Sequence, residues 1–377
     1  MSKSIKKFVL PLILAVMLLV SACVTQTPLA EPTTPPEQTV AATEPVVEEP
    51  TEEPTEEVTA EPTAETIVIV DVIGREVTLQ QPATKLTGTH NPTLNAAVVL
   101  GGGGKYLVGF GSKSMGRGLY EQVIEGFEEL PEVGKGSNIN LESVIAAGAD
   151  LVILPKRHQD LVPQFEAANI PAIVVLDSSE SFETIQQTLT LLGMAVGESE
   201  KAEEIGAFLS GQLENAQTLL KDTTEKPSVL FLGASSALSV APGSMIQTSL
   251  IEAGGGVNAV SGVEGLGGFV DVSIEQIITW NPDVIWFPQY SDYTVEDLLN
   301  DPAWSSISAV QNNRVHQFPS LLEPWDQPTA AVALGVDWAL HTLHPDLFSF
   351  EDLMKNVDAF FTLVYDKTFT AEQLGIE

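Results

Sequence analysis

The sequence is poor in cysteine and in positive charge. One residue of 377 is Cys, which excludes an intrachain disulfide framework and a metal site built from several cysteines. Lys and Arg number 17 against 51 Asp and Glu, which gives a formal charge of −34. A chain this acidic repels phosphate backbones and anionic lipid, so we expect no nucleic-acid partner and no membrane adsorption through basic patches.

The apolar run near the N-terminus, residues 8–20, is too short for an ordinary membrane-spanning helix. Three lysines precede it, a pattern typical of a secretory signal. Residues 20–23, Val-Ser-Ala-Cys, resemble the lipobox of bacterial lipoproteins. We predict that residues 1–22 are a lipoprotein signal peptide and that Cys23 carries two acyl chains, enough for a stable membrane anchor. The alternative is a plain signal peptide in which this cysteine is incidental.

The segment after Cys23 has almost no capacity to form a core. Residues 24–66 hold 11 Thr, 11 Glu and 8 Pro, and no Lys, Arg or aromatic residue. Such a composition buries too little apolar surface to offset the entropy of ordering, and proline and like charges keep the chain extended. We predict that residues 23–66 are a disordered tether.

From Ile67 onward, short β-branched runs alternate with segments of helical periodicity, as is typical of α/β folds with parallel sheets. The sequence predicts strands at 67–72, 76–79, 85–88, 106–110, 151–154, 172–176, 228–232, 284–287 and 315–318, and helices at 94–100, 141–147, 161–168, 199–221, 244–253, 274–279 and 329–343. The predicted fold class is α/β, with two Rossmann-like lobes at residues 67–181 and 223–377. A helical segment at 182–222, containing one long connecting helix, joins the lobes, and a cleft separates them.

An internal repeat supports two related lobes. Residues 141–153 align with residues 274–286 at an offset of 133 without a gap. Both copies read as a helix, a breaker, an Asp and an apolar strand, and both place a Glu at the second position. Any two βα units are broadly alike, but the matched Glu and Asp favour duplication.

The order of these features resembles a known family. It runs from the lipobox and tether through Asp71-x-x-Gly74-Arg75, the block 140–152, a long connecting helix, the block 281–285 and a late Pro-Trp-Asp-Gln-Pro-Thr at 324–329. This order is similar to that of the substrate-binding lipoproteins of ABC importers for iron–siderophore, haem and cobalamin. These belong to the helical-backbone class of periplasmic-type binding proteins.

The resemblance implies an extracytoplasmic, lipid-anchored monomer that delivers its ligand to an ABC permease dimer with its ATPase. The ligand implied is a metal chelate, a ferric siderophore first, with cobalamin, haem or an oxyanion such as molybdate as alternatives. We expect no intrinsic cofactor and no enzymatic activity. The glycine run at 101–104 lacks the spacing of a phosphate loop, and no nucleophile elbow or H-E-x-x-H motif is present. A chelatase-like enzyme and a surface receptor without a transporter remain alternatives.

The resemblance also implies how the protein meets its permease. Members of the family dock through one surface Glu on each lobe, and the matching positions are Glu142 and Glu275, which the repeat superimposes. A two-fold permease presents the same basic pocket twice, which would give the repeat a purpose. The alternative is that both glutamates are solvated residues favoured by the helix dipole.

Ligands of α/β sheets bind beyond the carboxyl ends of the strands, so we expect the site in the loops that follow the strands. Basic residues are scarce, yet Lys113, Arg117, Lys135, Lys156 and Arg157 fall in predicted cleft loops of the first lobe, which favours an anionic ligand. The predicted ligand-binding residues are His90, Asn91, Lys113, Arg117, Tyr120, Lys156, Arg157, Ser244, Phe269, Tyr290, Glu323 and Trp325.

Direct metal binding by the protein is a weaker hypothesis. His90 and His158 are candidate ligands, but both lie in the first lobe without a nearby Cys or His. A protein metal site usually needs three or four ligands, so Glu323 or Asp326 would have to complete the set across the cleft.

Overall fold

The computed structural model describes residues 66–113, 118–176, 180–263 and 268–376. All of these belong to one unit that begins at Glu61. The predicted signal peptide, Cys23, all of the predicted tether except its last residue, and Arg117 lie outside the described residues.

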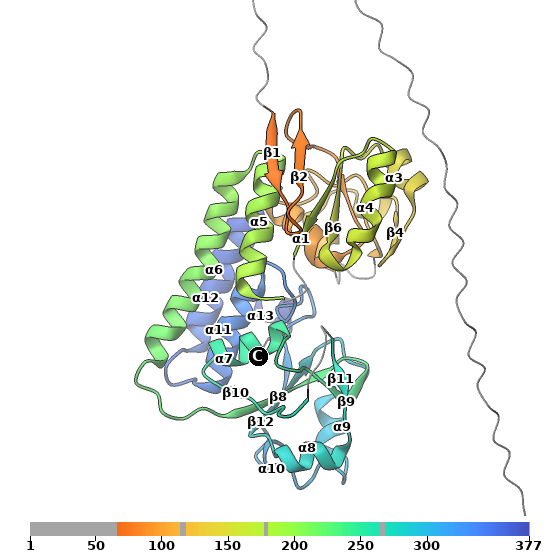
Figure 1. Cartoon of the computed structure of the whole chain (residues 1–377). Helices are drawn as coiled ribbons and strands as arrows, with labels where there is room; N and C mark the ends of the chain where they lie inside the picture. Colours follow the sequence, from red (N-terminus) through yellow and green to blue (C-terminus); the bar gives the residue numbers. More distant parts are fainter. Residues whose placement is uncertain (1–65, 114–117, 177–179, 264–267, 377) are drawn as a thin grey trace, which may run out of the picture. The chain divides into compact units, whose positions relative to one another are not determined.

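The first lobe contains β1 to β7 and the helices between them (Figure 1). Its elements are β1 (Ile67–Val70), β2 (Glu76–Leu79), β3 (Leu86–Thr87), α1 (Asn91–Leu100), α2 (Leu119–Val123), the short 3-10 helix η2 (Phe127–Glu129), β4 (Gly134–Lys135), β5 (Asn138–Ile139), α3 (Leu141–Ala147), β6 (Leu151–Pro155), the 3-10 helix η3 (Lys156–Leu161), α4 (Val162–Ala167) and β7 (Ala172–Val175). Strands β3, β6 and β7 form a parallel sheet in that order. The expected strand at 106–110 contributes only isolated bridges, at Leu107 and Phe110.

The second lobe contains β8 to β13 and is built on a larger sheet. Its elements are β8 (Ser228–Gly233), β9 (Ser236–Val240), α7 (Ile246–Ala253), β10 (Val257–Asn258), β11 (Val270–Asp271), α8 (Ile274–Trp280), β12 (Val284–Pro288), α9 (Val295–Asn300), α10 (Ser308–Gln311) and β13 (Val315–Phe318). Strands β8, β12 and β13 are parallel neighbours, as predicted. The sequence did not predict β9 and β11, which extend the sheet in antiparallel fashion.

Both sheets are buried on two faces. In β6, Leu151 and Ile153 face the largest core, whereas Val152 and Leu154 face a second core beneath α3 and α4. In β8, Phe231 faces that same largest core and Leu230 faces a third core beneath α8, α9 and α10. This alternation, with helices covering each face, is the doubly covered α/β architecture that the sequence predicted.

A helical bundle lies beside the sheets. It consists of α5 (Phe182–Val196), α6 (Ser199–Leu220), α11 (Val332–Leu343) and α12 (Phe350–Tyr365), which run side by side in Figure 1; the chain ends with α13 (Ala371–Leu374). Helix α6 is the predicted connecting helix, with 22 residues and a length of roughly 33 Å.

Polar contacts join the helices of this bundle. Asn356 of α12 donates hydrogen bonds of 2.9 Å to Asp337 of α11 and to Gln212 of α6. Gln186 of α5 donates to Ser210 of α6 at 2.6 Å. These contacts link α12 to both α6 and α11, and α5 to α6.

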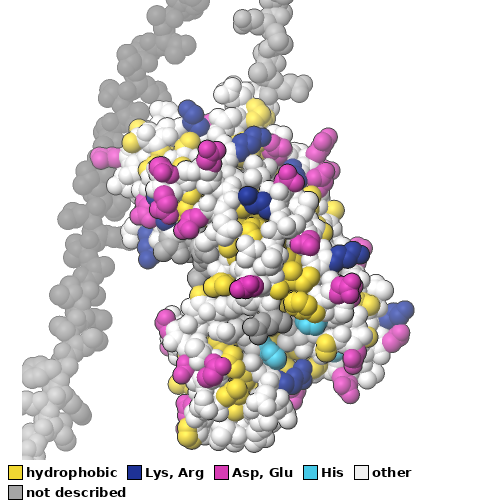
Figure 2. Space-filling model, turned by 180° about the vertical axis from the view of Figure 1, so that it is seen from behind, with side chains coloured by type: hydrophobic (Ala, Val, Ile, Leu, Met, Phe, Trp, Pro, Cys, Tyr) yellow, Lys and Arg dark blue, Asp and Glu magenta, His cyan; other side chains and the backbone are white. Residues whose placement is uncertain are grey.

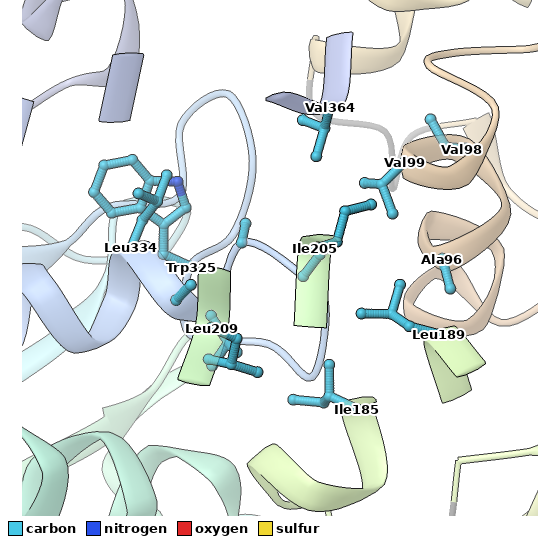
Figure 3. Packing of buried hydrophobic residues seen from close by; sticks show 14 of the residues in the cluster. Ala96, Val98, Val99, Ile185, Leu189, Ile205, Leu209, Trp325, Leu334 and Val364 are labelled. Atoms are coloured by element: carbon cyan, nitrogen blue, oxygen red, sulfur yellow. The ribbon is translucent and has the colours of Figure 1, made fainter. Parts of the chain in front are cut away.

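The largest core is continuous through α1, the helical bundle and one face of each sheet. Figure 3 shows Val99 of α1, Ile205 of α6 and Val364 of α12 pointing into the same interior. Because elements of both lobes contribute to one core, the bundle holds the loops at the strand ends of each lobe against a common support.

Candidate functional site

A histidine pair and an arginine lie at the carboxyl ends of β3 and β6. His90 follows β3 and occupies the N-cap position of α1 without a side-chain capping bond. Arg157 and His158 follow β6 within η3. Both histidines are buried, and their Nδ1 atoms have no hydrogen-bond partner among the described residues. The fold therefore brings together three residues that the sequence analysis singled out.

These imidazoles are neutral at pH 7. Burial holds the pKa of His90 well below its usual value, and the nearby charges of Arg157 and His158 lower it further. Burial and the charge of Arg157 likewise lower the pKa of His158. A neutral imidazole has a free lone pair, so both rings are in the state that coordinates a metal or accepts a hydrogen bond.

Arg157 has one acidic neighbour that the sequence analysis missed. Its Nη1 atom lies 3.6 Å from Oε1 of Glu180, just before α5. Burial raises the pKa of Glu180, although the charge of Arg157 opposes this. The guanidinium remains half exposed, so it keeps donors for a ligand.

The other basic residues predicted for the cleft have different surroundings, and Arg117 lies outside the described part. The amide of Lys113 donates to Glu132 at 3.1 Å, and its Nζ contacts the carbonyl of Glu128. The amide of Lys156 donates to the carbonyl of Leu176. Lys135 is exposed on the β4–β5 hairpin. Of the predicted basic cluster, Arg157 is the member whose charge lowers the pKa of both histidines.

A buried hydrogen-bonded cluster joins the two halves of the chain. Asn95 of α1 donates to Oε1 of Glu323 at 2.8 Å and to the hydroxyl of Tyr120 at 3.3 Å. Burial raises the pKa of Glu323 to about 7, while the hydrogen bond from Asn95 opposes the rise. Burial and the nearby Glu323 also raise the pKa of Tyr365 at the end of α12.

Sequence reasoning found Glu323 and Tyr120 but not Asn95, which links them. Asn95 lies one helical turn after Asn91, on the same side of α1, and this spacing was the available signal. Oε2 of Glu323 and Oδ1 of Asn91 are buried and have no partner in the described part of the chain. The cluster therefore presents unused acceptors beside the lobe junction.

Hydrogen bonds with Gln289 hold the loop that carries Glu323 in place. Oε1 of Gln289 accepts hydrogen bonds of 2.7 Å from the amides of Ser320 and Leu321, and its Nε2 donates to the carbonyl of Gly375. Trp325, in the same loop, is fully buried in the largest core. Tyr120 is also buried, against Phe110 and other aromatic rings. In this structure neither aromatic ring offers an open face to a ligand.

The remaining predicted residues lie in the second lobe. Ser244 is exposed just before α7, and Phe269 is 36% exposed and packs against Phe231. Tyr290 follows β12 and accepts a 3.3 Å hydrogen bond from Gln327. Their role in ligand binding stays a prediction, as it does for the first-lobe residues.

Two sizeable cavities lie in the described part of the chain, and the second of them is lined in part by Gln289, the neighbour of Tyr290. One of about 550 Å³ is lined by the end of α6 and by α7, including Leu220 and Glu252. Another of about 540 Å³ lies beneath the C-terminal segment and is lined by His316 and Gly375. Neither contains a residue that the sequence analysis predicted for the ligand site.

The predicted docking glutamates occupy equivalent positions. Glu142 and Glu275 are exposed in the first turns of α3 and α8, whose bounds differ by the offset of the repeat. The matched aspartates also act alike. Asp150 accepts hydrogen bonds from the amide and hydroxyl of Thr84, just before β3, and Asp283 accepts them from the amide and hydroxyl of Ser228 at the start of β8. The repeat is therefore structural as well as sequential.

The described residues hold neither a ready-made metal cluster nor a membrane-spanning helix. Within residues 66–113, 118–176, 180–263 and 268–376, no three or more His, Cys, Asp or Glu side chains are grouped so as to hold a metal ion. None of the helices in these ranges is both long enough and apolar enough to cross a membrane.

Comparisons with known proteins agree on one family. The model of the periplasmic binding protein family matches residues 93–321. The molybdate-binding protein MolA of Haemophilus influenzae is 24% identical over 80% of this chain and 92% of its own. YvrC of Bacillus subtilis, described as an uncharacterized ABC transporter substrate-binding lipoprotein, is 24% identical over 75% of this chain and 87% of its own.

Solved structures share the two-lobed fold. A periplasmic solute-binding protein of Veillonella parvula superimposes with a TM-score of 0.74 at 24% identity, covering 82% of this chain and 96% of its own. The molybdate-bound structure of MolA gives a TM-score of 0.71 at 22% identity, covering 80% and 99%. The fold predicted from the sequence is thereby confirmed, and the chain belongs to the periplasmic binding protein family.

Proposed function

We propose that this protein captures an anionic metal chelate outside the cytoplasm and delivers it to the permease of an ABC importer, with a ferric siderophore as the first candidate. The observation that carries the proposal is the grouping of two neutral, buried imidazoles with the half-exposed guanidinium of Arg157. Family membership supports the transport role.

The chemistry of this group suits a ligand that brings its own metal. Two imidazoles supply at most two ligands to a metal that usually takes four to six, so a chelator would supply the others. The guanidinium would pair with a carboxylate or catecholate of the chelator, an arrangement for which Arg is well shaped. His90 and His158 would then complete the coordination or donate hydrogen bonds to the chelate.

Molybdate is the second candidate. It is favoured by the similarity to MolA, whose name and structure record molybdate binding. An oxyanion would use Arg157 and protonated ring nitrogens as hydrogen-bond donors and would need no metal ligand from the protein. Cobalamin and haem stay in the panel of ligands to be tested.

Delivery requires a membrane location and a docking surface. Cys23 would provide the anchor, at the cell surface or in a periplasm, and the similarity to a lipoprotein supports this. Glu142 and Glu275 would pair with basic residues of the two permease subunits, one per lobe. The protein would act as a monomer, since one copy offers both contacts.

The ligand assignment is tested by calorimetric titration of the purified protein with a ferric catecholate siderophore, haem, cobalamin and molybdate. Arg157→Gln is expected to weaken binding of the anionic ligand about 10- to 100-fold, the usual cost of losing a charged hydrogen bond. The exposed Lys367 supplies a matched control, Lys367→Gln, which removes the same charge far along the chain. Equal affinities for the two variants would exclude Arg157 from the site.

Variants of the two histidines distinguish a ferric chelate from molybdate as the ligand. If a ferric chelate binds through His90 or His158, His90→Gln or His158→Gln changes its visible absorption spectrum. If molybdate is the cargo, the titration shows molybdate binding and no iron complex is retained. An absence of binding to every member of the panel would contradict the proposal.

A further inference from the structure

Two exposed isoleucines occupy the same position in the two lobes. Ile145 of α3 is 53% exposed, and Ile278 of α8, 133 residues later, is 38% exposed. Their preceding neighbours, Val144 and Ile277, are fully buried and attach the two helices to their lobes. Each isoleucine therefore points away from the core that holds its helix.

The backbone frames around the two isoleucines are alike. Asn140 and Ser273 cap the two helices by accepting a hydrogen bond from the third residue after each of them. Gly148 and Asn281 end the helices in the left-handed conformation. Because both ends match, equivalent positions of the two helices, including those of the glutamate and the isoleucine, are set in the same way relative to the caps.

Each isoleucine lies beside the docking glutamate of its helix. Glu142 and Ile145, like Glu275 and Ile278, are three residues apart. On a helix surface this spacing makes the two side chains neighbours, with Cβ atoms about 5–6 Å apart. All four side chains are exposed. Each lobe thus carries a small surface with one carboxylate and one aliphatic group, which we call the Glu–Ile patch.

The occurrence of an exposed isoleucine at the same position in both lobes suggests a shared function. Isolated apolar side chains on a surface are ordinary. Here residue type, exposure and charged neighbour are repeated at one equivalent position in each lobe. A partner with two equivalent sites, such as a two-fold dimer, would meet the same chemistry at both.

We propose that Ile145 and Ile278 are apolar anchors that insert into equivalent hydrophobic sockets on the two subunits of the permease dimer, each next to the basic group that pairs with the glutamate. This proposal rests on the docking role in the proposed function and adds to it. The carboxylates would steer and orient the complex, while the buried aliphatic groups would slow its dissociation.

The test measures binding of the full-length protein to its permease–ATPase complex in lipid nanodiscs. Ile145→Gln and Ile278→Gln are each expected to weaken binding about tenfold, and the double variant about a hundredfold, from the apolar surface lost at each contact. Met194→Gln is the matched control, since Met194 is also helical and 38% exposed but lies in α5. It should bind like the unaltered protein, and all variants should keep their melting temperature and ligand affinity.

A reference variant, Glu142→Lys with Glu275→Lys, separates this inference from the proposed docking. Loss of binding with the lysine variant but not with the glutamine variants would overturn the anchors and leave the docking glutamates standing. Unchanged binding in all variants would overturn both. A loss confined to one isoleucine would overturn the equivalence of the two sockets.

Discussion

Glu323 makes the stability of this protein depend on pH in an unusual direction. Burial raises its pKa to about 7, and the pKa of Asp337, in the helical bundle, is also raised to about 7 by burial. Between the ordinary carboxyl pKa near 4 and pH 7, the folded state binds more protons at these sites than the unfolded state. Each group therefore lowers the free energy of unfolding as pH rises through this window, by on the order of 3 kcal/mol.

We predict that Glu323→Gln and Asp337→Asn each reduce the fall in the free energy of unfolding as pH rises. Urea unfolding between pH 5 and pH 8 should show a smaller decline for each single variant and the smallest for the double variant. Histidines with lowered pKa values, such as His90, make the free energy of unfolding rise with pH below pH 6.5. All four proteins share these histidines, so the difference between variants isolates the contribution of the carboxyl groups. Identical slopes in all four proteins would contradict the account of Glu323.

At the residue scale, local chemistry could be predicted and long-range pairing could not. The sequence marked His90, Arg157 and His158 because histidines and scarce basic residues follow predicted strands. It could not predict the contact between Asn95 and Glu323, which are 228 residues apart. Such a pair leaves no periodic or spacing signal in a single sequence.

At the element scale, the repeat was the most accurate guide. It placed α3–β6 and α8–β12 at matched bounds, because caps, breakers and apolar strands are all local signals. Helix α12 was missed, although Ser349 and Asp352 form a capping box before an amphipathic segment. Its packing against α6 and α11 depends on tertiary contacts that no local pattern encodes.

Two glycines test the helix packing in opposite directions. A Cβ on Gly335 of α11 would lie 2.4 Å from the carbonyl oxygen of Trp325, whereas a Cβ on Gly211 of α6 would meet nothing within 4 Å. Gly335→Ala should therefore lower the free energy of unfolding by about 1–3 kcal/mol through overpacking. Gly211→Ala should raise it by about 0.5–1 kcal/mol through helix propensity.

Urea unfolding at one pH measures both changes, with the unaltered protein as reference. Similar stabilities for the two alanine variants would show that α11 does not pack closely against the loop of Trp325. That loop also carries Glu323, so the comparison reports on the support of the candidate site.

At the scale of the whole molecule, the structure shows where the acidic side chains lie. Figure 2 shows Asp and Glu side chains spread over one face among fewer Lys and Arg side chains. Arg157, beside two neutral histidines, is therefore a local exception to this acidity. In the Glu–Ile patches, a negative charge recurs at the repeated position of each lobe. The sequence predicted the fold, whereas the ligand depends on loop geometry that composition does not encode.

The most direct test of the central claim is native mass spectrometry of the protein produced in medium containing a ferric catecholate siderophore, haem, cobalamin and molybdate. We expect one non-covalently bound anionic ligand per chain, whose mass is unchanged after prolonged incubation. A chemically altered ligand released in excess of the protein would identify an enzyme. Either that result or the absence of any retained ligand would contradict a binding protein of this kind.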